Sequence, residues 1–227
     1  MPHDRDNDDL TIVTFTGETP PPPVERRSEP RNLSVLRTAL LRTYRGDELC
    51  LVRNISSGGL MAHVYSDLDI GDPVTIEFKS DQTVRGSVVW RQDELAGIAF
   101  AQAVTLADVL SCRFRDPLSR DPRGPRASVD VPGRIKSGGS WRPVILRNIS
   151  QGGARLQLGG QDDLARTVLL VAPGLAPLPG EVRWRNATDV GIAFDRPLPF
   201  PDIAHWVADS HRQQQRADFP AALAAAG

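Results

Sequence analysis

Two arginines, an asparagine, a serine and a glycine have the types and spacing to bind an anion. Arg27 and Arg31 are four residues apart, so in an extended segment their side chains lie on one face. Asn54 and Ser56 alternate on a candidate strand, which places their side chains on one face as well. Gly59 and the glycine before it let backbone N–H groups approach a bound group. Because the guanidinium fork matches phosphate and the edge of guanine, this set favours a phosphate-bearing ligand.

The same residues have a second interpretation that needs no ligand. A strand that ends in a turn also uses Asn and Ser to hydrogen-bond the local backbone, and Gly to change direction. The arginine pair also fits a solvated basic loop. From the residue types alone, both interpretations stay open.

The asparagine–serine–glycine pattern recurs later in the chain. Residues Arg53–Leu60 return as Arg147–Ala154, a shift of 94 residues. A constant offset over this distance indicates a duplicated domain. The same offset relates Trp90 to Trp184 and Gly97–Phe100 to Gly191–Phe194.

The second copy keeps only part of the pattern. Arg126 stands roughly where Arg31 does, but Pro122 occupies the position four residues earlier. The arginines here are spaced by threes, which turns successive side chains of an extended arm to opposite faces. We therefore expect a weaker second site or none. Its candidate residues are Arg123, Arg126, Asn148, Ser150 and Gly153.

Short strands separated by turn signals must position these residues. They predict a mainly β chain with a small barrel or sandwich in each copy. Apolar residues at helical spacing predict a helix over Thr105–Phe114, and a second helix opens at Pro201. The strands expected in the first copy are Val35–Thr43, Leu49–Ile55, Leu60–Val64, Val74–Phe78, Val84–Trp90 and Gly97–Phe100.

Composition argues against several classes of protein. The net charge of −1 gives no general attraction to nucleic acid or to a membrane, and no apolar run is long enough to span a bilayer. Cys50 and Cys112 lack metal or redox spacing, and the start of the chain lacks an apolar signal core. We expect a cytoplasmic protein with buried thiols and no metal or cofactor. No nucleophile–base pair or paired carboxylates stand out, so we expect no enzyme.

The arginine pair, a spacer of about one hairpin, and Asn-x-Ser-x-x-Gly together resemble the PilZ domain, the bacterial receptor module for cyclic di-GMP. The resemblance covers residues 26 to about 114, and a weaker copy covers about 120 to 216. It implies two six-stranded antiparallel β-barrels, each followed by a C-terminal helix. It also implies that the arginine arm closes over a cyclic dinucleotide on the barrel surface.

The resemblance assigns a role to each matching residue. Arg27 and Arg31 would contact phosphate and the O6 and N7 edge of guanine, which suits the geometry of Arg. Asn54 and Ser56 would hydrogen-bond guanine. An arginine just before the pair goes with an intercalated ligand dimer in this family. The full ligand set is Arg26, Arg27, Arg31, Asn54, Ser56, Gly58 and Gly59.

These inferences divide the chain into five parts: a disordered tail (1–24), a first domain with the complete motif (25–115), a linker (116–126), a second domain (127–216) and a C-terminal tail (217–227). We expect a cyclic di-GMP receptor in which the ligand orders the arginine arm and alters a surface for a separate downstream protein. We expect neither nucleic-acid binding nor membrane insertion. The alternative is a ligand-free interaction or scaffold protein.

Overall fold

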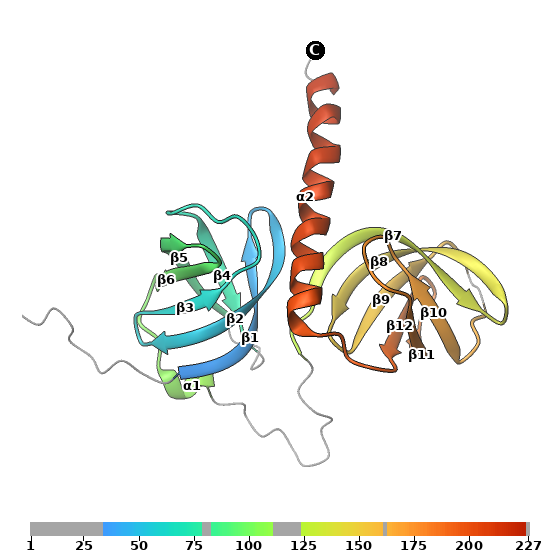
Figure 1. Ribbon diagram of the computed structural model, residues 1–227, viewed down its shortest axis with the longest axis horizontal. Coiled ribbons are helices and arrows are strands. Elements are labelled where there is room, and N and C mark those ends of the chain that lie inside the picture. Colours follow the sequence, from blue (N-terminus) through green and yellow to red (C-terminus); the bar gives the residue numbers. More distant parts are fainter. Residues whose placement is uncertain (1–33, 79–82, 111–123, 161–162, 226–227) are drawn as a thin grey trace, which may run out of the picture. The chain divides into compact units, whose positions relative to one another are not determined.

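The chain forms two closed antiparallel β-barrels of six strands each, and a long helix follows the second (Figure 1). The computed structural model describes residues 34–78, 83–110, 124–160 and 163–225. The first barrel consists of β1 (Ser34–Thr43), β2 (Gly46–Ser56), β3 (Gly59–His63), β4 (Pro73–Glu77), β5 (Thr83–Gln92) and β6 (Leu95–Phe100). The second consists of β7 (Ala127–Ser137), β8 (Ser140–Ser150), β9 (Gly153–Leu158), β10 (Thr167–Val171), β11 (Leu178–Arg185) and β12 (Asp189–Phe194).

The two barrels share one topology. The strand order around the first is β1-β2-β3-β6-β5-β4, and β4 pairs with β1 to close it. The second follows the equivalent order, closed by β7 and β10. The predicted pair of six-stranded antiparallel barrels is therefore confirmed.

A helix follows each barrel, as predicted. The first, α1 (Leu106–Leu110), has five residues within the predicted range, and the end of that range lies outside the described residues. The second, α2 (Phe200–Ala225), begins one residue before Pro201, which suits proline because its ring fixes a helical φ. It continues into the range that the sequence assigned to a C-terminal tail.

Alternation of apolar and polar residues explains the strands. In β4, Val74 and Ile76 are buried, while the residues between and after them are half-buried. Glycines supply the backbone geometry at the equivalent hairpin turns: Gly46 has φ 131°, and Gly138 and Gly139 have φ 55° and 87°. Only glycine adopts this left-handed region without cost.

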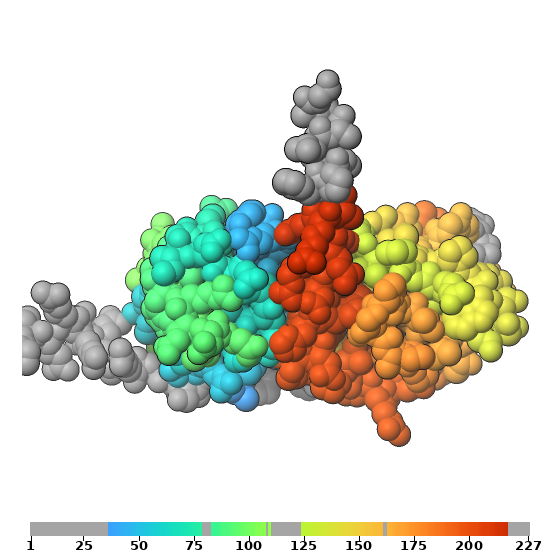
Figure 2. All heavy atoms as spheres, turned by 45° about the horizontal axis from the view of Figure 1, so that its top comes forward, coloured from blue at the N-terminus to red at the C-terminus, as the bar shows by residue number. Residues whose placement is uncertain are grey.

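Helix α2 joins the two barrels. Its apolar stripe includes Ile203, Trp206 and Val207, all buried in the hydrophobic cluster of the second barrel. Leu40 and Leu49 of the first barrel belong to that same cluster, although their neighbours along β1 and β2 face the first barrel's own core. The helix packs against β2 and β7, and Figure 2 shows its red atoms against both barrels. The outer face of the β1–β2 hairpin is therefore part of a second core.

The junction predicts a stability effect. Leu49→Ala removes a side chain that is 2% exposed, and should lower the free energy of unfolding of the full chain by about 2–4 kcal/mol. Leu36→Ala on β1, where the side chain is 71% exposed, is the matched control and should change it by less than about 0.5 kcal/mol. Urea denaturation followed by circular dichroism measures both. Equal stability of the two variants would contradict the assigned packing.

Candidate ligand-binding site

A bulge in β2 places the predicted asparagine on the outer surface of the first barrel. The β2–β3 pairing shifts register between Val52 and Asn54. Because of the extra residue, Val52 and Ile55 both point into the core, while Asn54 is exposed and Ser56 is half-buried. An inserted residue of this kind re-aims side chains at a strand end. The second barrel repeats the register shift between Leu146 and Asn148.

The serine of each pattern closes its own turn. Ser56 Oγ donates to the carbonyl oxygen of Gly59 at 3.1 Å, and Ser150 Oγ donates to that of Gly153 at 3.2 Å. These bonds stabilise the tips of the β2–β3 and β8–β9 hairpins. In both barrels the serine thus hydrogen-bonds the local backbone, as the interpretation without a ligand predicts.

The second glycine of each pair is required by strand packing. A Cβ on Gly59 would lie 2.5 Å from the carbonyl oxygen of Ile98, and one on Gly153 would lie 2.3 Å from that of Ile192. Gly58, by contrast, has no atom within 4 Å of such a Cβ. Since neither residue of the 58–59 pair has a positive φ, close approach of β3 and β6 is what demands glycine at position 59.

A tryptophan lies in the same surface row as the asparagine. Asn54 pairs with Met61, Met61 with Gly97, and Gly97 with Trp90, so the four residues cross β2, β3, β6 and β5. The Trp90 ring lies over Gly97, where a Cβ would come within 1.9 Å of its Nε1, and it remains 39% exposed. An exposed aromatic face can stack on a nucleobase. Sequence reasoning used Trp90 only as a landmark of the repeat.

The start of β1 lies beside the asparagine of this row. Ser34 pairs with Asn54, and it follows Arg31 by three residues. Arg26, Arg27 and Arg31 themselves lie outside the described residues, and their contacts remain predictions.

The equivalent surface of the second barrel is a groove of about 990 Å³. It is lined by three residues of the predicted weaker site, Arg126, Ser150 and Gly153, and by the exposed Trp184 over Gly191. Asn148 pairs with Ser128 near the start of β7. Its Oδ1 is buried without a hydrogen-bond partner among the described residues. Arg123 lies outside those residues.

Two arginines that sequence analysis missed also line this groove. Arg166 precedes β10 and Arg183 lies on β11, and both form ion pairs with Glu181 at 3.6 and 3.4 Å. The residue of the first barrel that corresponds to Glu181 is Ser87. Glu181 pairs with Ala193 of β12, and Ser87 pairs with Ala99, the equivalent residue of β6. The groove thus carries its own carboxylate. No local motif marks these arginines, because they come from β11 and the start of β10, which β12, β9 and β7 separate from β8 around the barrel.

The sequence also contains two cysteines, of which the structure describes Cys50. Cys50 is 1% exposed, and burial raises the pKa of its thiol to about 12, so it stays protonated. Cys112 lies outside the described residues. In the part of the chain that the structure describes, no three His, Cys, Asp or Glu residues are grouped to hold a metal ion. No helix in that part is long and apolar enough to cross a membrane.

The two neighbouring glycines allow a matched test. Gly59→Ala forces its Cβ against the Ile98 carbonyl, and we expect a loss of about 1–3 kcal/mol in unfolding free energy without any ligand. Gly58→Ala meets open space and should change it by less than about 0.5 kcal/mol. Thermal unfolding of the ligand-free variants measures the difference. If Gly59→Ala were as stable as wild type, the glycine would have to be explained by ligand contact instead.

Comparison with known proteins identifies the family of the chain. The family model of the PilZ domain matches residues 25–121 and again residues 117–208. No curated protein matches the chain. Among solved structures, the chain is similar to the PlzA protein of Borreliella burgdorferi in complex with c-di-GMP, with 12% identity, coverage of 77% of this chain and 88% of that one, and a TM-score of 0.30. It is also similar to the inhibitor of motility MotI/DgrA of Bacillus subtilis, with 13% identity, coverage of 82% and 99%, and a TM-score of 0.33. For YcgR of Escherichia coli in complex with c-di-GMP, the identity is 14%, the coverage 82% and 88%, and the TM-score 0.29. Since the two family matches together span most of its length, the chain belongs to the PilZ domain family and carries two PilZ domains in tandem.

Proposed function

We propose that the chain is a cyclic di-GMP receptor, rather than an enzyme, and that the first barrel holds the main ligand site. The observation that carries the proposal is the register of β1 on β2. Ser34 pairs with Asn54 and follows Arg31 by three residues, which supports the proposal that the arm with Arg27 and Arg31 lies over the surface row of Asn54 and Trp90. Family membership supplies the ligand class.

Each group on this row suits one part of the ligand. The arginines would bind phosphate oxygens and the O6 and N7 edge of guanine through paired N–H donors. Asn54, which is exposed on the surface, would hydrogen-bond the base. Trp90 would stack on it. Ligand binding would order the arm and change the surface that the barrel offers to a separate protein, because only the bound state has these contacts.

The arginine pair gives the first functional test. Arg27→Ala or Arg31→Ala removes charge-assisted hydrogen bonds of about 1.5–3 kcal/mol, so affinity for cyclic di-GMP should fall roughly ten- to hundredfold. Isothermal titration calorimetry of the full chain measures it. Arg196→Ala, an exposed arginine in the loop before α2, is the control and should leave affinity unchanged.

Specificity and stoichiometry refine this test. Cyclic di-AMP lacks the O6 acceptor and should compete poorly. Equal competition would identify a generic anion site, and unchanged titrations in both arginine variants would refute the assignment. If Arg26 favours an intercalated dimer, the first barrel will bind two ligands rather than one.

We further propose that the second barrel binds the ligand weakly. Its groove offers Arg126, Arg166, Arg183 and Trp184, which supports an anion site. However, the Glu181 carboxylate already lies against two of these arginines, and a phosphate would have to displace it. Repulsion from this carboxylate would offset part of the gain from the arginines.

Removing that carboxylate should strengthen the second site. In the Arg27→Ala/Arg31→Ala background, Glu181→Ser introduces the residue that the first barrel has at this position, and affinity for cyclic di-GMP should rise roughly five- to tenfold. Glu77→Ser, which removes an ion-paired glutamate from the first barrel, is the control and should have no effect. Calorimetry of the triple variants measures both. Tight residual binding before the substitution would instead make the chain a receptor with two equivalent sites.

A ligand-free scaffold is the second candidate function. Ser56 and Gly59 favour it, because the barrel itself requires both residues whether or not a ligand binds. Absence of any cyclic di-GMP binding to the folded wild-type chain would select this function.

A further inference from the structure

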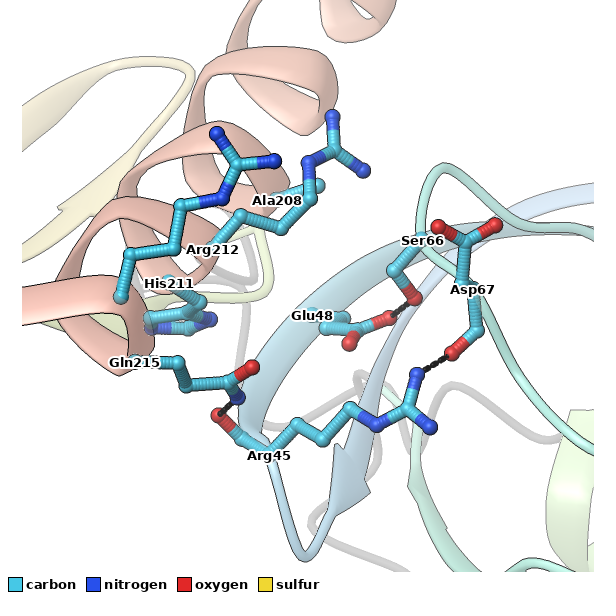
Figure 3. Close-up of a pocket in the computed structure, with 9 residues that line it drawn as sticks. Arg45, Glu48, Ser66, Asp67, Ala208, His211, Arg212 and Gln215 are labelled. Carbon is cyan, nitrogen blue, oxygen red and sulfur yellow. Dashed lines mark hydrogen bonds between the residues drawn. The ribbon is translucent and has the colours of Figure 1, made fainter. Parts of the chain in front are cut away.

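A second type of pocket lies where α2 meets the first barrel, away from the residues of the PilZ motif. Its volume is about 420 Å³ (Figure 3). The first barrel contributes Arg45, Glu48, Ser66 and Asp67 to its walls. The helix contributes Ala208, His211, Arg212, Gln215 and Arg216.

Three guanidinium groups surround this pocket. Arg212 and Arg216 are four residues apart on α2, so they share one face of the helix. Arg212 pairs with the exposed Asp209, whereas Arg216 has no ion-pair partner among the described residues. Arg45 reaches the pocket from the β1–β2 turn, and its carbonyl oxygen accepts a 3.3 Å bond from Gln215. Arginines therefore line the pocket on both sides, and the Arg45 guanidinium also contacts Tyr44, Asp67 and Asp69.

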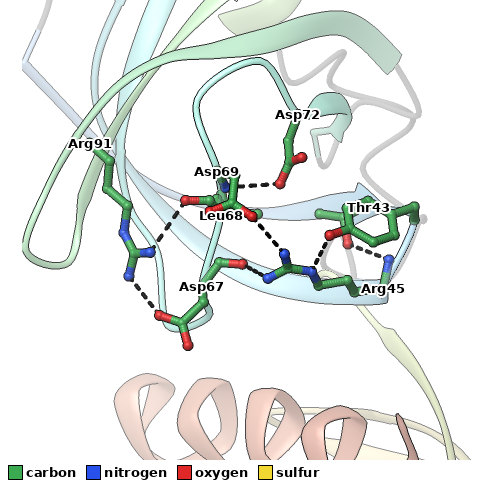
Figure 4. A network of polar contacts seen from close by, with 8 residues as sticks. Thr43, Arg45, Asp67, Leu68, Asp69, Asp72 and Arg91 are labelled. Atoms are coloured by element: carbon green, nitrogen blue, oxygen red, sulfur yellow. Dashed lines mark hydrogen bonds and ion pairs between the residues drawn. The ribbon is translucent and has the colours of Figure 1, made fainter. Parts of the chain in front are cut away.

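The wall on the barrel side is held in place before any ligand arrives (Figure 4). Arg45 donates to the carbonyl oxygen of Asp67 and forms an ion pair with Asp69 at 2.9 Å. Arg91 binds the Asp67 carboxylate at 3.0 Å and the Leu68 carbonyl at 3.3 Å. Because Arg91 neutralises the Asp67 carboxylate, Asp67 reduces the positive charge of the pocket only slightly.

The floor of the pocket contains a buried carboxyl group. Glu48 is 4% exposed and accepts a hydrogen bond from Ser66, and among the described residues it has no ion pair. Burial raises its pKa, which favours the uncharged form.

A buried imidazole supplies an unpaired polar atom. His211 is 8% exposed and packs against Gly46, and its Nε2 lies 3.0 Å from the carbonyl oxygen of Ser128. Since a carbonyl only accepts, Nε2 donates this hydrogen bond. Nδ1 is buried and has no hydrogen-bond partner in the described part of the chain. It faces Gly46, where a Cβ would lie 3.0 Å from it.

From these contacts we infer that the pocket between α2 and the first barrel binds a phosphate group, either free or as a small monoester. Its oxygens accept hydrogen bonds from Arg45, Arg212 and Arg216. A phosphate offers oxygens in three directions to these three guanidinium groups, whereas the two oxygens of a carboxylate lie in one plane. The bound group would bridge the barrel and the helix, so it would stabilise their contact. This site is additional to the cyclic di-GMP site and shares no residue with it.

The test uses inorganic phosphate as the probe on the full chain at constant ionic strength. Phosphate should raise the Tm in a saturable manner, while chloride should not. Arg212→Gln/Arg216→Gln should weaken the apparent affinity roughly tenfold or more, because two charge-assisted contacts are lost. Arg196→Gln is the matched control and should respond like wild type. Calorimetric titration gives the same constants independently.

Three results would overturn the inference. An equal rise in Tm with chloride would show that the effect is charge screening and not phosphate binding. A double variant that responds like wild type, with an unchanged Tm before phosphate is added, would place any phosphate elsewhere. Equal binding of malonate would show that the pocket does not distinguish phosphate from a carboxylate and would refute the assignment to phosphate.

Discussion

The architecture depends on one hydrophobic contact, the packing of α2 against the outer face of the β1–β2 hairpin. A barrel closes its own core, so nothing in the fold of one PilZ domain requires Leu40 and Leu49 to be covered. Here both leucines are buried with Ile203 and Val207, in the same cluster as the interior of the second barrel. At about 25 cal/mol per Å² of apolar surface, covering them stabilises the junction. The two domains are thereby coupled thermodynamically as well as by the chain.

The two copies share the backbone features of the barrel and differ in the charges on its surface. Both copies have the bulge in the second strand, the serine bond across the hairpin, and a tryptophan over a glycine. These features follow from strand geometry, and each copy needs them to close. The outer surface is under no such constraint. Where the first copy has Ser87, the second has Glu181 between two arginines, so two similar backbones present different fields to an anion.

Local patterns were sufficient for the fold but not for the surroundings of the site. Alternation in β4 and the left-handed glycines of the hairpins identify strands and turns without knowledge of distant contacts. The alternation of Asn54 and Ser56 correctly places them on one face, yet the bulge that turns this face outward depends on pairing with β3. Trp90 and Arg183 lie far along the chain from the asparagine–serine–glycine residues whose surface they share. The burial of Leu49 was also unpredictable, because β2 is apolar towards both faces.

The bond from Ser56 to Gly59 and the tight approach of Gly59 to Ile98 affect how such motifs are compared across related proteins. Both positions are maintained by the need to fold, so a domain that no longer meets its ligand will keep them for as long as it keeps its barrel. In a duplicated protein, a serine and glycine of this pattern are therefore no evidence of ligand binding by themselves, and the second domain has Ser150 and Gly153 together with Pro122 four residues before Arg126.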